Sequence, residues 1–246
     1  MASRKAATPG NMSIDSTSVQ DYVKAIYAFT EWQEAPITAS RLAARLSVAN
    51  SSVTEMVRKL VDLGLAEHQK YSPIRLTAAG RSLALVMVRR HRLVETFLVE
   101  ELGYRWDEVH DEAELLEHTV SDAFIERLDV KLGRPARDPH GDPIPTAEGR
   151  IRLPSAVPVS LLDTGHACRV ARISDENPEV LRFFAAHAVG LDTPLVVRGR
   201  RPFDGALVVA MNRGEPDSAF DLGAEPAGAL WVESLGTHPG CTFTMP

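Results

Sequence analysis

The stretch PITASRLAARLSVANSSVTEMVRKLVDLGLAEH, residues 36–68, decides the fold of the N-terminal part of the chain. Thr38 or Ser40 can cap a short helix, and after a brief break a second helix begins near Asn50. Apolar residues recur on one face of each helix, and Gly64 can close the second helix in a left-handed conformation. Two short helices joined by a tight turn predict a helix-turn-helix, with an ordinary helical hairpin as the alternative.

The exposed face of the second helix has side chains suited to DNA. Small hydroxyl groups near its N-terminal end can enter a major groove, and a basic pair further along can reach phosphates. The helix dipole adds a favourable field toward a phosphate at that end. The residues on this face are Ser51, Ser52, Thr54, Glu55, Arg58 and Lys59.

The segment after the second helix favours the DNA-binding reading over the hairpin. Residues 65–69 and 74–76 read as two short strands, and residues 70–73 form the turn between them. A hairpin with a basic tip directly after such a helix is the wing of a winged helix. We therefore expect Lys70 and Arg75 to lie near the DNA backbone.

Helices are expected on both sides of this module. Residues 16–32 have a helical apolar period, and Ser18 with Asp21 resembles a capping pair at its start. Residues 77–103 form a long helix with more apolar surface than one small domain needs, which indicates a homodimer. On this helix His91 and Glu95 stand at i and i+4, so they could share a cation or form an ordinary surface pair.

A further helix is expected over residues 111–132, beginning with DEAELLEHTVSD. Glu114, Glu117 and His118 would leave one face of it within a turn of each other. Two carboxylates and an imidazole without a thiolate favour a hard divalent cation. Taken alone, the pattern is more typical of a solvated helix face that carries charge than of a metal site.

The rest of the chain differs in character. Residues 133–158 are dense in Pro, Gly and Asp and read as a linker or an irregular crossing segment. In residues 159–246 short apolar runs alternate with turn clusters, and one helical piece at 178–189 interrupts them, which predicts a small β domain of barrel type. No nucleophile elbow, phosphate-binding loop or dinucleotide fingerprint is present.

Composition sets further bounds. The net charge of −6 is uneven, because residues 1–92 carry 13 Lys/Arg against 7 Asp/Glu and the remainder carries the acidic excess. A basic front half suits contact with phosphate. No run of about 18 apolar residues could span a bilayer, and the first dozen residues do not form a secretory signal. Cys168 and Cys241 lie far apart, which excludes a cage of cysteines around a metal and suits a reduced, cytoplasmic chain.

The order of these elements, with HRLVETFL at 91–98, VHDEAELLEHTVSD at 109–122 and DPHGDPIP at 138–145, resembles the diphtheria-toxin-repressor family of metal-dependent transcriptional regulators, in particular its manganese-responsive actinobacterial branch. The resemblance implies an α+β fold. It implies a disordered tail at residues 1–15 and a winged helix-turn-helix DNA-binding domain at 16–80. A helical dimerisation and metal-binding domain at 81–146 would follow, then a linker at 147–158 and a Src-homology-3-like β-barrel at 159–246.

The resemblance also implies two metal sites. The primary ligands would be Asp21, Glu114, Glu117 and His118. Iron-responsive members carry Met and Cys where this chain has Asp21 and Glu114, and oxygen in place of sulfur favours Mn(II). The second set would be His91, Glu95, His110 and Glu179. Two departures are Arg182, where relatives often have Gln or an acid, and Lys24, where short manganese regulators have Glu.

The DNA-facing positions that the resemblance carries over are Ala49, Asn50, Ser51, Ser52, Thr54 and Glu55. A two-fold dimer would read a palindromic, double-stranded operator. The implied function is a manganese(II)-dependent repressor of manganese uptake and homeostasis genes, not an enzyme. The alternatives are a repressor of the same fold that responds to Fe(II) or another divalent transition metal and, more distantly, a metallohydrolase that uses the Glu-rich helix.

Overall fold

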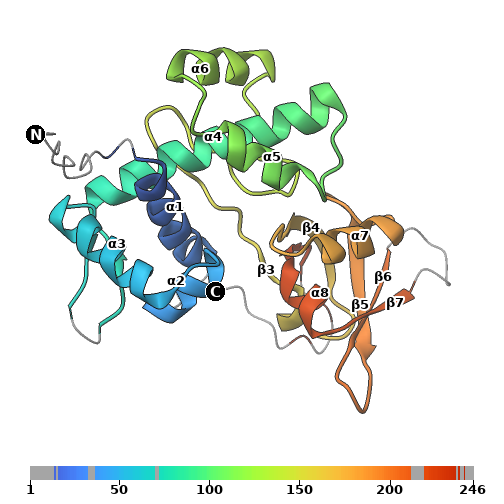
Figure 1. The fold of residues 1–246 in the computed structure, drawn as a ribbon. Helices are drawn as coiled ribbons and strands as arrows, with labels where there is room; N and C mark the ends of the chain where they lie inside the picture. Colours follow the sequence, from blue (N-terminus) through green and yellow to red (C-terminus); the bar gives the residue numbers. More distant parts are fainter. Residues whose placement is uncertain are drawn as a thin grey trace, which may run out of the picture. The chain divides into compact units, whose positions relative to one another are not determined.

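The computed structural model describes residues 14, 16–32, 37–69, 72–211, 219–236, 238 and 241. The expected tail, residues 1–15, lies outside this part of the chain except for Ile14, and so does Lys70. The chain forms two compact units, Met1–Val88 and Arg89–Pro246. Figure 1 shows the elements of both, and their mixture of helices with small antiparallel sheets confirms the α+β class.

The first unit is the predicted winged helix-turn-helix. Its helices are α1 (Thr17–Glu31), α2 (Ala39–Arg45) and α3 (Asn50–Asp62), and its antiparallel wing pairs β1 (Ala66–Glu67) with β2 (Arg75–Leu76). Of the two possible caps, Thr38 caps α2, because its hydroxyl accepts from the Arg41 amide at 3.3 Å. The core of the unit includes fully buried side chains from all three helices: Val19, Val23, Ile26, Leu42, Val53 and Leu60.

The expected capping pair of α1 is wrong. The helix begins at Thr17 with Ser16 as its N-cap residue, so Ser18 lies inside the helix and the first turn contains no acidic residue. Asp21 is therefore in the second turn, where the helix dipole stabilises a carboxylate much less. Asp21 therefore does not serve as part of the N-terminal cap of α1.

The long helix α4 (Ala78–Leu102) begins in the first unit and continues in the second. Its first turn packs on the end of the α3–β1 connection, where Gly64 has the expected left-handed conformation with φ of 70°. Thr77 Oγ1 donates to the Gly64 carbonyl at 2.7 Å. A Cβ atom on Gly80 would lie 1.9 Å from the Leu65 carbonyl oxygen, so only glycine fits at this position of the helix.

The helix expected over residues 111–132 is two helices, α5 (Val109–Leu116) and α6 (Asp122–Lys131). The break has a local cause. Thr119 Oγ1 donates to the Leu116 carbonyl at 2.9 Å, and Ser121 Oγ accepts from the Phe124 amide at 3.2 Å. Hydroxyl side chains that bond nearby backbone compete with the helix and form a new N-cap here.

After α6 the chain crosses back over α4. Residues 141–145 are buried, and Arg92 donates to the Pro143 carbonyl at 2.7 Å while Arg89 donates to the Pro145 carbonyl at 3.0 Å. Residues 146–148 are exposed. The first part of the Pro- and Gly-rich stretch is thus a packed crossing segment.

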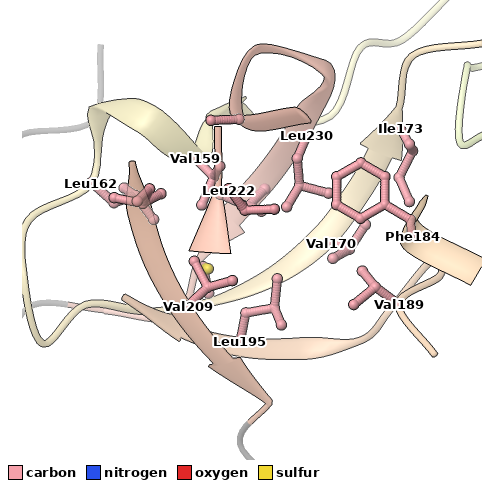
Figure 2. Packing of buried hydrophobic residues seen from close by; sticks show 14 of the residues in the cluster. Val159, Leu162, Val170, Ile173, Phe184, Val189, Leu195, Val209, Leu222 and Leu230 are labelled. Atoms are coloured by element: carbon pink, nitrogen blue, oxygen red, sulfur yellow. The ribbon is translucent and has the colours of Figure 1, made fainter. Parts of the chain in front are cut away.

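The C-terminal part is a six-stranded antiparallel sheet of β3 (Val157–Pro158), β4 (Ala167–Ile173), β5 (Pro194–Arg200), β6 (Leu207–Met211), β7 (Ala219–Leu222) and β8 (Leu230–Ser234). The strand order is β3-β8-β4-β5-β6-β7. A short 3-10 helix η1 (Val159–Leu161) and the helices α7 (Pro178–Ala186) and α8 (Ala224–Ala229) complete it. Figure 2 shows the apolar core, where Phe184 of α7 lies among side chains from the sheet.

In the part of the chain that the structure describes, no helix combines the length and the apolar character needed to cross a membrane.

Replacing Gly80 by alanine tests the packing of α4 in the first unit. Gly→Ala inside a helix normally stabilises a protein, but here the new Cβ would meet a backbone oxygen that cannot move aside. We expect Gly80→Ala to lower the free energy of unfolding by about 1–3 kcal/mol, measured by urea denaturation. Gly228→Ala in α8 is the matched control, because its Cβ would meet nothing within 4 Å. An unchanged or higher stability of the Gly80 variant would contradict this packing.

Candidate metal centre

Three of the predicted primary ligands lie at the C-terminal end of α5. Glu114 is in the helix, Glu117 is its C-cap residue, and His118 follows in the turn. Glu117 is fully buried, and its Oε1 lies 3.4 Å from His118 Nε2. Glu117 keeps helical backbone angles, with φ of −56° and ψ of −30°, so its carboxylate and the His118 imidazole still approach each other after the helix has ended.

The fourth predicted primary ligand, Asp21, belongs to the other compact unit. It is half-buried in the second turn of α1. The first unit therefore presents a carboxylate at this position of α1, and its participation in a metal site remains a prediction.

A second cluster joins three predicted ligands with one that was not predicted. His91 Nε2 lies 2.9 Å from Glu95 Oε1 and 3.2 Å from His110 Nδ1. His110 Nδ1 lies 3.3 Å from Glu95 Oε1 and 3.2 Å from Asp175 Oδ2. One donor atom from each of the four residues lies within 4.8 Å of the others. Two imidazoles and two carboxylates without sulfur form a donor set that fits a divalent cation preferring nitrogen and oxygen.

Glu179, the predicted third-domain ligand, does not lie in this cluster. Its side chain is 79% exposed and bonds Arg182 at 2.7 Å, and Arg182 also donates to Asp107 at 3.1 Å. Asp175 contacts His110 instead, from the turn between β4 and α7. Its only signal in the sequence is an acid-rich turn after a predicted strand, which is too common to single out.

The electrostatics of the cluster keep the carboxylates ionised. Burial alone would lower the pKa of His110, but hydrogen bonds and the charges of Asp175 and Glu95 outweigh it and raise that pKa to about 11. Burial would likewise raise the pKa of Glu95, yet the neighbouring His91 charge and bonds from His110 and His91 lower it. A cation bound at this cluster would therefore replace the proton on His110 as the source of positive charge.

His91 connects this cluster to the α5 ligands. Its Nε2 faces Glu95, and its Nδ1 lies 2.6 Å from Glu117 Oε2. One buried imidazole therefore contacts a carboxylate of each group. Such a contact fixes the ring orientation and the rotamer of the Glu117 carboxylate together.

Residues of the crossing segment support Glu95 from its other side. His140 is fully buried, its Nε2 lies 2.7 Å from the Trp106 carbonyl oxygen, and its Nδ1 lies 3.8 Å from Glu95 Oε2. The carbonyl can only accept, so Nε2 carries the hydrogen of that bond. Asp138 accepts from the amides of His140 and Asp142, both at 2.9 Å. These residues stand in the DPHGDPIP motif, but sequence reasoning assigned no role to any of them.

The predicted DNA-facing residues that the structure describes, which exclude Lys70, lie where a ligand could reach them. Thr54 Oγ1 donates to the Asn50 carbonyl at 2.9 Å, and Lys59 is half-buried. Arg75 is exposed on β2. The exposed residues at the start and along the outer face of α3 are Ala49, Asn50, Ser51, Ser52, Thr54, Glu55 and Arg58.

Comparison with known families covers nearly all of the chain. The N-terminal DNA-binding domain of iron-dependent repressors matches residues 16–74, their metal-binding and dimerisation domain matches 77–146, and the FeoA domain matches 157–234. The iron-dependent repressor IdeR of Mycobacterium tuberculosis is 33% identical over 190 residues, which are 76% of this chain and 79% of IdeR. The diphtheria toxin repressor of Corynebacterium diphtheriae is 35% identical over 132 residues, 54% of this chain and 57% of that protein.

Solved structures agree. A manganese-dependent transcriptional repressor in complex with manganese is 50% identical, with a TM-score of 0.82, and the match covers 88% of this chain and 99% of that one. A second manganese-dependent transcriptional repressor is 46% identical, with a TM-score of 0.71, and the match covers 88% of this chain and 100% of that one. The chain belongs to the diphtheria-toxin-repressor family of metal-dependent transcriptional repressors. The family consists of DNA-binding repressors and not enzymes, which removes the metallohydrolase alternative.

A pair of substitutions distinguishes the two acids of the C-terminal domain. We expect Asp175→Asn to weaken the second site for Mn(II) by tenfold or more, about 1.4 kcal/mol, because it removes a carboxylate 3.2 Å from His110. Glu179→Gln, the matched control, should leave the affinity unchanged. Bound Mn(II) is counted by electron paramagnetic resonance during titration of each variant. A loss with the Glu179 variant and none with Asp175→Asn would reverse the assignment.

Proposed function

We propose that this protein is a manganese(II)-dependent repressor that binds a palindromic operator as a homodimer and controls genes of manganese uptake and homeostasis. The observation that carries the proposal is the chemistry of the primary donor set, Asp21, Glu114, Glu117 and His118, which contains no sulfur. Mn(II) is the weakest binder in the Irving–Williams series, so a site selects it by hard ligands and geometry and not by raw affinity.

The relatives point in two directions on the metal. Structures at 50% and 46% identity carry manganese in their descriptions, whereas the IdeR relatives at 33% identity are described as iron-dependent. Higher identity supports manganese, and so does the pair of oxygen ligands at positions 21 and 114. Fe(II) remains the competing cofactor, since imidazole and carboxylate also suit it.

Metal binding would control DNA binding by connecting the two compact units. Asp21 belongs to the winged helix unit, and the other three ligands belong to the second unit. A cation held by all four residues would bind more tightly to one arrangement of the DNA-binding domains than to others. This difference in affinity is what allows a ligand to shift the equilibrium between the arrangements. A coupling of about 1–3 kcal/mol, typical of linked sites, would change operator occupancy markedly.

Exposed apolar side chains on the second unit support the dimer. Large hydrophobic residues on α4, α5 and α6 are 45–71% exposed, and a second copy of the chain would cover them. These residues are Leu102, Leu115, Phe124 and Val130. With two copies, the exposed faces of two α3 helices would read two half-sites of an operator.

Substitution of the ligands tests the site. Asp21→Ala and Glu117→Gln should each reduce the metal-dependent gain in operator affinity by about 5- to 150-fold, the range of a typical coupling, while leaving a folded dimer. Asp111→Asn, an exposed acid on the same α5, is the matched control and should respond normally. The measurement is a gel-shift titration with Mn(II), with sedimentation to check the dimer. An undiminished metal response in either ligand variant would refute the assignment.

The choice of metal is tested by changing two donor atoms. Wild-type protein is titrated with each metal anaerobically in matched buffers. We expect it to bind the operator at a lower free concentration of Mn(II) than of Fe(II). The double variant Asp21→Met with Glu114→Cys should lose the Mn(II) response, because sulfur is a poor ligand for a hard cation. A tenfold or greater preference of the wild type for Fe(II) would overturn the proposal for manganese.

A further inference from the structure

A third group of metal-ligating side chains lies in the C-terminal domain, apart from both clusters described above. His166 stands directly before β4, and His238 and Cys241 follow β8. One donor atom from each of the three residues lies within 4.8 Å of the others. The Cys241 sulfur lies 3.5 Å from His166 Nδ1, and the two imidazole rings meet edge to face with centroids 5.5 Å apart.

The hydrogen bonds of Ser234 are compatible with a His166 tautomer that leaves Nδ1 free of hydrogen. Ser234 Oγ lies 3.3 Å from the Gly236 carbonyl oxygen, to which it donates its single hydrogen. The same Oγ lies 2.7 Å from His166 Nε2, so with its own hydrogen on the Gly236 carbonyl it can accept a hydrogen from that nitrogen. Nδ1 then carries a lone pair directed at Cys241. A histidine whose other nitrogen donates to a fixed acceptor is the usual arrangement of a metal ligand.

The surroundings of His166 suit this role as well. The side chain is fully buried, so its position is fixed by the surrounding domain, and a neutral imidazole there is the form that binds metals. Gly165 has φ of 92°, and a Cβ there would lie 3.4 Å from His238 Nδ1. The positive φ favours glycine at this turn, and the turn places the loop before β4 beside the His238 ring.

We propose that His166, His238 and Cys241 form a metal site of their own, which takes a thiophilic cation, zinc(II), through two imidazoles and a thiolate. Three protein ligands leave one position of a tetrahedral zinc open to water. The thiolate separates this site from the oxygen- and nitrogen-only clusters of α4 and α5, since soft ligands select zinc over manganese. Bound zinc would hold the segment after β8 against the start of β4.

Cobalt(II) is the probe that reports sulfur ligation. Reduced full-length protein, stripped of metal and loaded with Mn(II), is titrated with Co(II) and followed by absorption. We expect a sulfur-to-cobalt charge-transfer band that rises to saturation as Co(II) is added and disappears when Zn(II) is added in excess over all the metal sites. Cobalt that enters the α4 and α5 clusters cannot produce this band, because those clusters contain no sulfur.

Variants assign the band to the proposed residues. Cys241→Ser should abolish it, and His238→Gln should weaken cobalt binding at this site by tenfold or more. Cys168→Ala and His187→Gln are the matched controls and should keep the band. Cys168 is buried in the sheet core with its thiol pKa raised to about 12, so it does not supply a thiolate. His166→Ala is avoided, since a fully buried side chain can be needed for folding.

Two results would overturn the proposal. If the wild type gives no charge-transfer band, Cys241 and His166 form only a thiol-to-imidazole hydrogen bond. If the band persists in Cys241→Ser while circular dichroism shows a folded protein, another sulfur is the ligand. Equilibrium dialysis against Zn(II) provides the independent count, and Cys241→Ser should bind one zinc fewer per chain than the wild type.

Discussion

The buried imidazole of His91 holds the centre of the second unit together, because its two nitrogens contact carboxylates from different parts of the chain. Nδ1 meets Glu117 at 2.6 Å and Nε2 meets Glu95 at 2.9 Å. Both carboxylates are almost completely buried, and a buried charge without a partner would cost several kcal/mol. The position of α5 relative to α4 therefore depends on this contact in addition to the apolar core around Leu93 and Leu98.

The same contact explains why the two groups of metal ligands belong to one network. Glu95 is surrounded by His91, His110 and His140, and Asp175 closes the cluster from the C-terminal domain. Each side chain limits the rotamers of the next, so the donor atoms are held near one another before any cation arrives. Pre-organisation of this kind lowers the cost of ordering ligands on binding.

Local patterns in the sequence were sufficient for the winged helix unit. The helix-turn-helix, the wing and the long helix α4 follow from the apolar periods of the sequence, from the cap at Thr38 and from the left-handed Gly64. Each of these signals affects only residues close to it in the chain. The prediction of one helix over 111–132 was wrong, because the Thr119 and Ser121 side chains bond the nearby backbone and a new helix begins after them. Asp175 could not be found, because its contact with His110 joins residues far apart in the chain. Lys70 stays a prediction, as it lies outside the described residues.

The crossing segment after α6 shows how the C-terminal domain is joined to the helices. Asp142 in that segment bonds Arg172 of β4 at 2.8 Å and also faces Arg92 of α4 at 3.4 Å. A chain that ended after residue 146 would keep α1 to α6 but would lose Arg172 and Asp175, the charged partners that the C-terminal domain supplies to Asp142 and His110. The C-terminal domain can be separated from the helices at a clear boundary in the sequence, but its charged residues pair with residues outside it. A homologue that replaced this domain by another would therefore have to change residues 138–145 as well.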